Sequence, residues 1–282
     1  MIEQGLHDFS AAYYAGDPCP EPSLTAAGIH DLMTMTPAHF AARHPRLTRW
    51  PGLWKSPGRA ADFGTVVKAL VLNKGHEIAV FDVDEFSTKG SRFRRDQAKE
   101  DGKIAIKRKE FEKAQIAAGV IEEQLREAFG RWPLGNSDVT LVWQRLTVQH
   151  GPIWCRERVD HFGANVMIQF DTATGYVTQE DIARKCVNAA ADYRALWFTS
   201  GWHRLYPDQA MPSCHYMVME VIPPFRLHGA GIDFVWGVAA SEEIEVAVAR
   251  FGSHLRKDDW YEQKPERLSL KRPAFVAHEA MA

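Results

Sequence analysis

Basic side chains gather in one segment of the chain. Between Lys89 and Lys113 there are ten Lys and Arg against five Asp and Glu, whereas the whole chain has a net charge of -2. A basic segment on an acidic body is typical of a surface that contacts the phosphates of a nucleic acid. A solvated helix face laced with ion pairs would have the same composition. In the first interpretation, the phosphate contacts are expected from Lys89, Arg92, Arg94 and Arg95.

Signals for several other chemistries are missing from the sequence. The histidines form no H-x-x-x-H or H-E-x-x-H pair, and the four cysteines form no C-x-x-C pair, so neither pattern predicts a zinc site. We expect the cysteines to be reduced and mostly buried. The chain also lacks the Gly-x-Ser-x-Gly turn that presents a nucleophilic serine. The Gly-Ala-Gly run at Gly229 to Gly231 is interpreted as a hairpin turn rather than a phosphate-binding loop.

Several short strings, taken in order, resemble the exonuclease VIII group of the PD-(D/E)XK nuclease superfamily. Together they extend from about Ser23 to about Pro273, nearly the whole chain. The strings are Ser23 to Leu32 with Thr36 to Phe40, Phe63-Gly64-Thr65 followed by Lys68, Arg158-Val159-Asp160, Ile168 to Thr172, Arg194 to Phe198 with Ser200-Gly201, and Trp260-Tyr261. The resemblance implies a restriction-endonuclease-like core, that is, a mixed central β-sheet flanked by helices in an α/β fold.

Phosphodiester hydrolysis in such a site depends on carboxylates and one cationic side chain. The carboxylates hold Mg²⁺, which prefers oxygen ligands and neutralises the charge that develops on the phosphate. A lysine or polar group orients the attacking water. The resemblance places the first acid at Asp160, and the second acid and the lysine at alternate positions of the next strand, which share one face.

The positions that match the family site are mostly substituted in this sequence. Asp160 is retained, but Gln169 stands in place of the second acid and Asp171 in place of the lysine. Lys68 replaces a metal-binding histidine and Arg194 replaces a glutamine. In a second register Asp171 is the second acid and Ala173 stands in the lysine position. The water-orienting lysine is absent in both registers.

Two interpretations of this altered site follow. Lys68, Asp160, Asp171 and Arg194 comprise two cations and two anions, which could form a buried charge network without metal. Alternatively, Asp160 and Asp171 still hold Mg²⁺ in a divergent active site. A cofactor is therefore expected only if the protein is an active enzyme.

The resemblance implies three functions of different kinds. The first is a catalytically impaired exonuclease VIII relative that binds double-stranded DNA ends in phage or prophage DNA recombination or replication. The second is an active Mg²⁺-dependent deoxyribonuclease that uses Asp160 and Asp171. The third is a structural or interaction subunit without DNA binding. Members of the group can form rings around DNA, which makes a homo-oligomer an expectation from the resemblance alone.

Hydrophobic periodicity predicts the elements that position these residues. Helices are expected at 23–43 with a new start at Pro37, at 61–72, at 109–129, at 180–202 with a cap formed by Thr178 and Asp181, and at 241–252 with a cap at Ser241. Strands are expected at 78–81, 139–148, 153–159, 166–170, 216–222 and 232–238.

Length and composition indicate one globular unit. The 282 residues are 45% hydrophobic and 25% charged, which is usual for a folded α/β protein. Residues 1–60 contain seven of the 15 prolines and are expected to be mostly irregular chain with one short helix, wrapped on a nuclease-like domain at 61–282. The first ten residues do not resemble a secretory signal, and no apolar run reaches the roughly 20 residues of a membrane span. A soluble cytoplasmic protein is predicted.

Overall fold

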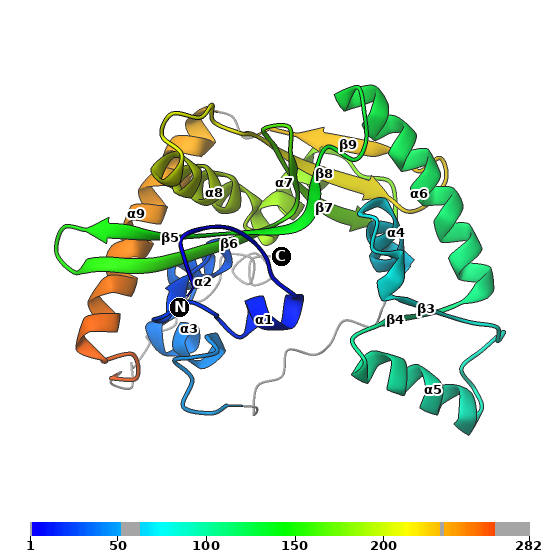
Figure 1. Ribbon diagram of the computed structural model, residues 1–282, viewed down its shortest axis with the longest axis horizontal. Coiled ribbons are helices and arrows are strands. Elements are labelled where there is room, and N and C mark those ends of the chain that lie inside the picture. The colour runs from blue at the N-terminus through cyan, green and yellow to red at the C-terminus, as the bar shows by residue number, and fades with distance from the viewer. Residues whose placement is uncertain (1, 52–62, 232–233, 263–282) are drawn as a thin grey trace, which may run out of the picture.

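A computed structural model describes residues 2–51, 63–231 and 234–262 of the chain. It is an α/β protein in which a mixed central sheet lies between helices (Figure 1), and this confirms the predicted fold class. The strands are β1 Gly5–Asp8, β2 Ser23–Leu24, β3 Ile78–Phe81, β4 Ile104–Lys107, β5 Asn136–Thr147, β6 Gly151–Gly163, β7 Val166–Ala173, β8 Ser213–Glu220 and β9 Leu227–Ala230. The α-helices are α1 Ala11–Ala15, α2 Ala26–Thr34, α3 Pro37–Arg43, α4 Phe63–Val71, α5 Lys89–Glu100, α6 Arg108–Phe129, α7 Gln179–Asn188, α8 Ala191–Leu205 and α9 Phe234–Lys257.

The central sheet is mixed because one of its pairs of long strands is parallel. Its order is β1-β5-β6-β7-β8-β9, and β2 adds to β6. The β7 and β8 strands are parallel, whereas β5, β6 and β7 are joined antiparallel. The long β5–β6 hairpin turns near Gly151, which has a positive φ of 71° that glycine adopts at little cost. The two strands of this hairpin match the strands expected at 139–148 and 153–159.

Helices cover both faces of the sheet and bury separate parts of the core. On one face, α2, α3, α8 and α9 pack on β5 and β6 around Trp143, Trp197 and Phe251. On the other face, α4 and α6 pack on β7 and β8. Each layer buries the apolar stripe of its helices, which is the main source of stability for an amphipathic helix.

Capping residues explain where several helices begin. The side chain of Thr25 accepts a hydrogen bond from Gly28 N at α2, and that of Thr36 accepts one from His39 N at α3. Pro37 is the first residue of α3, where its missing N–H costs nothing. Thr178 and Asp181 form the predicted capping box at α7.

A small accessory unit, β3-α5-β4, stands beside the main sheet (Figure 1). Its two strands are parallel and form their own sheet, to which α6 and α4 attach through apolar side chains such as Ile106. The α5 helix has only Ser91 and Ala98 buried, so nearly all of its side chains face solvent. The basic segment of the sequence therefore lies mainly on this exposed helix.

Some elements differ from the sequence prediction in the C-terminal half. Residues 232–238 were expected to be a strand, but the chain is helical from Phe234, and Ser241 lies inside α9 rather than at its start. The expected helix at 180–202 is two helices, because Ala190 adopts a left-handed conformation with φ of 52°. Gly229 belongs to β9 and not to a turn.

The first 43 residues are more regular than predicted. They form two strands and three helices, and β1 is the edge strand that pairs antiparallel with β5. The β2 strand pairs with β6 at Trp154 and Cys155. The tail string near Pro273 lies outside the described residues. Among the described residues, no helix is long and apolar enough to cross a membrane.

Candidate functional site

The candidate site lies where strand β6 changes its neighbour. On one side, β6 pairs with β2 at Trp154 and Cys155 and with β7 only from His161 onward. Among the described residues, the segment 156–160 therefore has no strand partner on that side. Two carboxylates of this segment instead accept hydrogen bonds from main-chain N–H groups. Glu157 accepts one from Ala26 N at 2.8 Å, and Asp160 accepts one from Phe170 N at 2.7 Å.

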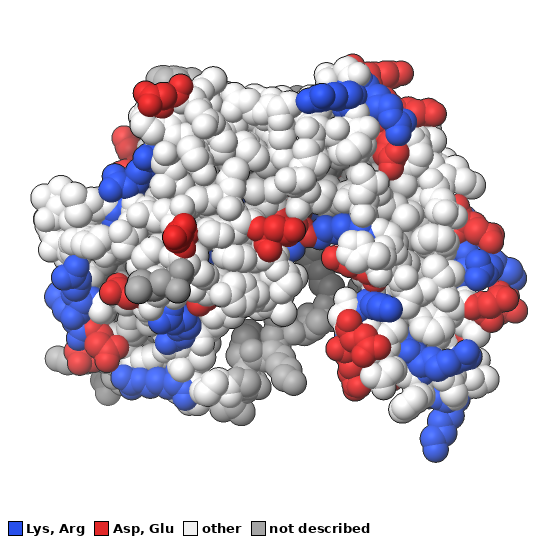
Figure 2. Space-filling view, viewed as in Figure 1, with Lys and Arg blue, Asp and Glu red and all other residues white. Residues whose placement is uncertain are grey.

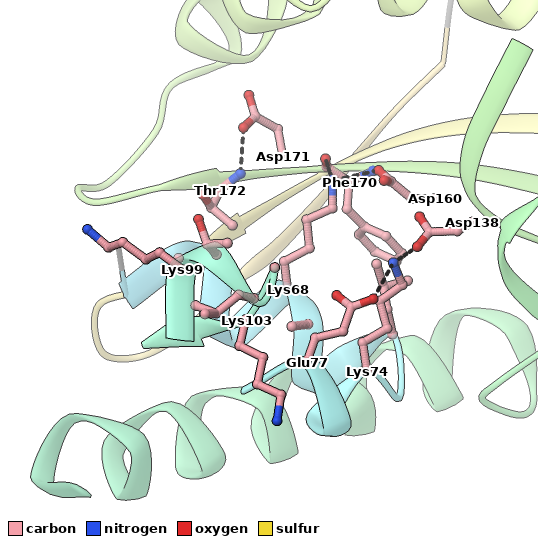
Figure 3. Close-up of a pocket in the computed structure, with 16 residues that line it drawn as sticks. Lys68, Lys74, Glu77, Lys99, Lys103, Asp138, Asp160, Phe170, Asp171 and Thr172 are labelled. Carbon is pink, nitrogen blue, oxygen red and sulfur yellow. Dashed lines mark hydrogen bonds and ion pairs between the residues drawn. The ribbon is translucent and has the colours of Figure 1, made fainter. Parts of the chain in front are cut away.

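Lys68 and Asp160 form the centre of the site. The Lys68 Nζ atom lies 2.8 Å from Asp160 Oδ2 and 2.9 Å from the main-chain oxygen of Phe170. Figure 3 shows the Lys68 side chain reaching from α4 to this point on β7. The helix comes close because Gly64, one turn earlier, has no side chain. A Cβ atom at Gly64 would lie 2.6 Å from Thr172 Oγ1.

Asp171 belongs to a second group of side chains on the same strand. Its Oδ2 accepts a hydrogen bond from Tyr216 at 3.0 Å and lies 3.3 Å from Lys185 Nζ. Lys185 also donates to the main-chain oxygen of Thr172 at 2.9 Å. Burial, together with the charge of Asp171, raises the pKa of the Tyr216 hydroxyl, so this hydroxyl stays protonated and donates.

Arg194 pairs with a carboxylate that the sequence analysis did not single out. Its Nε atom lies 2.7 Å from Glu157 Oε1, and the exposed fraction of the Glu157 side chain is 2%. Burial by itself would lower the pKa of Arg194, but the charge of Glu157 and its hydrogen bond raise it overall. The guanidinium therefore remains charged inside the protein.

The five predicted site positions thus lie together but do not form one network. They line two adjoining pockets of about 630 and 800 Å³, which we call the acid pocket and the side pocket. Asp160 lines the acid pocket, Gln169 and Arg194 line the side pocket, and Lys68 and Asp171 line both. The Gln169 Oε1 atom is buried without a hydrogen-bond partner among the described residues.

The sequence predicted one charge network for Lys68, Asp160, Asp171 and Arg194, but these residues form three separate ion pairs. Only Lys68 and Asp160 pair directly; Asp171 and Arg194 have partners of their own. The Lys185 and Glu157 partners come from α7 and β6. The sequence contained one signal for Glu157 as a site residue, the charged run 156–158 inside an otherwise apolar strand. Charges in a buried strand require partners.

Further charged residues of the acid pocket come from segments that the sequence analysis did not connect to the site. Asp138 contacts both Lys74 and Arg158, and Lys74 lies 3.7 Å from Glu77. Burial lowers the pKa of the Lys74 ammonium. Lys99 and Lys103 also line this pocket, and their side chains form no hydrogen bond or ion pair with the described part of the chain. Figure 3 shows their two nitrogen atoms apart from the other polar groups.

The side chains of this site do not fit a divalent metal ion. Within the described ranges, no group of three or more His, Cys, Asp or Glu is arranged to hold a metal. Asp160 is already bound to the Lys68 ammonium, and Asp171 is turned toward Lys185 and Tyr216. Mg²⁺ prefers six oxygen ligands, and a protonated ammonium repels it. Asp160 and Asp171 therefore do not form a metal-binding pair in this structure.

The four predicted phosphate-contacting residues all lie on α5. Arg92 donates two hydrogen bonds to the main-chain oxygen of Ser87, and Arg95 pairs with Asp96. Lys89 and Arg94 are exposed and have no ion-pair partner in the part of the chain that the structure describes. Figure 2 shows basic and acidic side chains interspersed over this face of the molecule. On this face, a phosphate contact would therefore depend on local groups of cations and not on a continuous basic surface.

Comparison with known proteins supports the fold. No family model matches the sequence, and no curated protein matches it. The structure is similar to the crystal structure of a "putative exonuclease" from Eubacterium rectale, with a TM-score of 0.55 and 12% sequence identity over 98% of this chain and 99% of that chain. A structure of SSO0001 has a TM-score of only 0.25 at 12% identity over 64% of this chain and 83% of that chain, which supports no argument.

Proposed function

We propose that this chain is an exonuclease VIII-like protein that binds double-stranded DNA ends and has lost metal-dependent cleavage. The observation that carries the proposal is the ion pair of Lys68 with Asp160, which stands at the position of the resembled nuclease site. The proposed setting, phage or prophage DNA recombination or replication, comes from the resemblance alone. The structural likeness to the Eubacterium rectale protein, with a TM-score of 0.55 over 98% of this chain, supports a nuclease-like fold, and fold by itself does not decide activity.

The charges around the pockets support binding to phosphate without metal. The acid pocket and the side pocket together have seven Lys and Arg and five Asp and Glu among their lining residues. A metal-dependent nuclease site requires an excess of carboxylates instead. Lys99 and Lys103 extend from the α5 end of the accessory unit into the acid pocket wall. Cations on α5 and in the pocket therefore provide a path for a DNA backbone.

Charge reversal on α5 should weaken DNA binding. We expect the wild type to bind linear duplex DNA at about micromolar strength, as non-specific phosphate contacts give near physiological salt. Replacement of Lys89, Arg92, Arg94 and Arg95 by glutamate should lower the affinity of the protein for DNA. It should also reduce the slope of log K against log salt by about three to four, because each lost phosphate contact removes about 0.9 from that slope. Fluorescence anisotropy at several salt concentrations measures both quantities.

Two matched double variants sharpen this experiment. Lys89→Glu with Arg94→Glu changes two exposed cations in the first half of α5 that have no ion-pair partner among the described residues. Arg256→Glu with Lys257→Glu makes the same charge change at the exposed end of α9, across the molecule (Figure 1). Only the α5 pair should weaken binding. Equal effects of both pairs would show that net charge alone decides affinity, and α5 would then have no special role.

The same protein incubated with Mg²⁺ and linear duplex DNA tests the loss of cleavage. We expect no digestion above background, because the described carboxylates do not form a metal site. Metal-dependent digestion by the wild type that disappears in Asp160→Ala would overturn the proposal and favour the active deoxyribonuclease. Absence of both digestion and DNA binding would favour the structural or interaction subunit.

A further inference from the structure

A third pocket, of about 920 Å³, lies outside the two pockets of the candidate site. This volume is usual for a pocket that holds a small molecule or part of a larger one. Its walls come from segments 6–11, 72–77 and 135–139, and from Arg158 and Phe162 on β6. None of the five predicted site positions lines it. We call it the amide pocket, because two of its lining residues are asparagines.

The two asparagines, Asn73 and Asn136, have unused side-chain amides. Both residues are exposed, and neither side chain forms a hydrogen bond with the described part of the chain. Each amide group offers N–H donors and a carbonyl acceptor. The edge of a nucleobase also presents donors and acceptors side by side, and asparagine is one of the residues that pairs with it.

A pair of stacked rings lines the same pocket. The ring centroids of His7 and Phe9 lie 4.7 Å apart, and the ring planes are inclined by only 15°. His7 Nε2 lies 2.8 Å from the main-chain oxygen of Glu3, which holds the imidazole in place. Phe9 also contacts Tyr13 edge-on, whereas His7 has no second ring neighbour among the described residues. The stack can therefore be extended by a flat group on the His7 side, as in proteins that stack unpaired bases on aromatic side chains.

The charges of the amide pocket favour an uncharged group over a phosphate. Its lining has three carboxylates, Asp8, Glu77 and Asp138, but only two Lys or Arg side chains, Lys74 and Arg158. Both of these cations pair with Asp138. A phosphate in this pocket would face an excess of negative charge, whereas a neutral nucleobase would not.

The amide pocket adjoins the acid pocket. Four residues line both: Leu72, Lys74, Glu77 and Asp138. Figure 3 shows Lys74, Glu77 and Asp138 together at one side of the acid pocket. The side chains of Lys99 and Lys103, which line the acid pocket, have no ion-pair partner in the described ranges and can face phosphates. A strand could therefore keep its phosphates beside the acid pocket while one of its bases turns into the amide pocket.

We infer that the amide pocket binds an unpaired nucleobase of a DNA end, stacked on His7 and hydrogen-bonded by Asn73 and Asn136. The inference rests on the proposed DNA binding and narrows its substrate class to duplex ends with a single-stranded extension. A base inside the duplex is already stacked and paired, so it would have to leave its partner before it could enter the pocket.

Binding of three DNA duplexes by the full chain tests the inference. One duplex is blunt, and the other two have an extension of about four nucleotides on the 3′ or the 5′ strand, with the fluorescent base 2-aminopurine in the extension. We expect at least one extended duplex to bind about tenfold tighter than the blunt duplex in fluorescence anisotropy, because one additional base stacks on the protein. The 2-aminopurine fluorescence should fall on binding as that base stacks.

Variants of His7 assign this stacking to the amide pocket. His7→Ala should lose the tenfold gain and the fall in fluorescence, whereas His7→Phe retains a flat ring and should keep both. Neither variant should change the affinity for the blunt duplex, because that duplex has no unpaired base. Circular dichroism establishes that both variants are folded.

A second pair of variants tests the amides. Asn73→Gly should weaken binding of the extended duplex severalfold, and glycine suits the positive φ of 58° at this position. Asn165→Gly is the matched control, because Asn165 has φ of 59° and does not line the amide pocket. Its affinity for the extended duplex should equal that of the wild type.

The outcomes separate this inference from the proposed function. Extended and blunt duplexes that bind equally well, without a fall in fluorescence, would overturn the inference and leave DNA binding standing. A fall in fluorescence that persists in folded His7→Ala would also overturn it, because the base would then stack elsewhere. If the wild type binds no duplex, the proposed function fails, and a single-stranded oligonucleotide with 2-aminopurine decides the inference by itself. A fall in its fluorescence that His7→Ala abolishes would support the base pocket, and no fall with the wild type would overturn it.

Discussion

Replacement of Glu157 by alanine is expected to lower the free energy of unfolding by about 3 to 5 kcal/mol, the usual cost of leaving the partner of a buried ion pair uncompensated. The Glu157 side chain is 2% exposed and that of Arg194 is 16% exposed. The change would leave the Arg194 guanidinium without its counter-charge and the Ala26 N–H without its acceptor. Urea denaturation of the wild type and the variant measures the difference.

Glu245→Ala is a matched control for this experiment. Glu245 also pairs with an arginine, Arg145, but its side chain is 60% exposed, so its loss should cost no more than about 1 kcal/mol. Glu157→Gln should be less harmful than Glu157→Ala, because the amide oxygen can still accept from Ala26 N. A cost for Glu157→Ala as small as that for Glu245→Ala would show that Arg194 finds another partner or reaches water, and that Glu157 does not hold α8 against β6.

Sequence patterns predicted the elements whose apolar spacing continues without interruption. The α4 helix and the β5–β6 hairpin appear where they were expected, because their apolar residues repeat at the helix or strand period over most of their length. The segment 232–238 also alternates, but it continues into residues such as Ile244, Val248 and Phe251, which form one buried helical face. Packing of that face extends the helix back to Phe234 and overrides the local alternation.

Short strands could not be predicted because their stability comes from distant partners. The β1 strand has four residues and exists through its ladder with β5, in which Gly5 faces Val142 and Asp8 faces Val139. The β2 strand has two residues and pairs with β6 more than a hundred residues later. Neither segment has a local pattern strong enough to specify a strand without this pairing.

The candidate site was predicted in part, and the physical reason is the geometry of β7. Alternation along the strand predicted that Gln169 and Asp171 share one face, and both line the side pocket. The Lys68 ammonium donates a hydrogen bond to the main-chain oxygen of Phe170, the residue between Gln169 and Asp171. A sequence motif specifies side chains but does not show that a main-chain oxygen accepts a hydrogen bond from Lys68 Nζ. The pairing of Lys68 with Asp160 is one part of the charge network that the sequence predicted, but the partners of Asp171 depend on how α7 and β8 pack.

Buried histidines should make the protein unstable in mild acid. His161 is fully buried, and its Nε2 atom accepts hydrogen bonds from Leu134 N and Gly135 N at 3.1 Å each, which requires an unprotonated Nε2. Burial lowers the pKa of His161 to about 4. His44 is also buried; its Nδ1 accepts from Arg46 N, and burial lowers its pKa to about 4 despite the nearby Asp17 carboxylate.

The direction of the effect follows from proton binding. A histidine with an ordinary pKa near 6.5 in the unfolded chain binds a proton at pH 5, whereas these two do not bind one in the folded protein. The stability that they contribute is therefore complete above about pH 6.5 and is lost as the pH falls toward about 4, with a loss of up to about 3 kcal/mol for each histidine. Urea denaturation at half-unit pH steps from 7.5 to about 4 would measure this loss.

A pair of variants assigns the loss of stability in acid to His161. His161→Gln keeps a hydrogen-bond acceptor in the side chain but cannot titrate, so the variant should be less dependent on pH between about 6.5 and 4 even if it is less stable at neutral pH. His76→Gln is the control, because His76 is exposed and its replacement should leave the pH profile unchanged. A His161→Gln profile parallel to that of the wild type would mean that protonation of His161 costs the folded protein little. The two hydrogen bonds to Leu134 and Gly135 would then have to be replaceable by water or by local rearrangement of the chain.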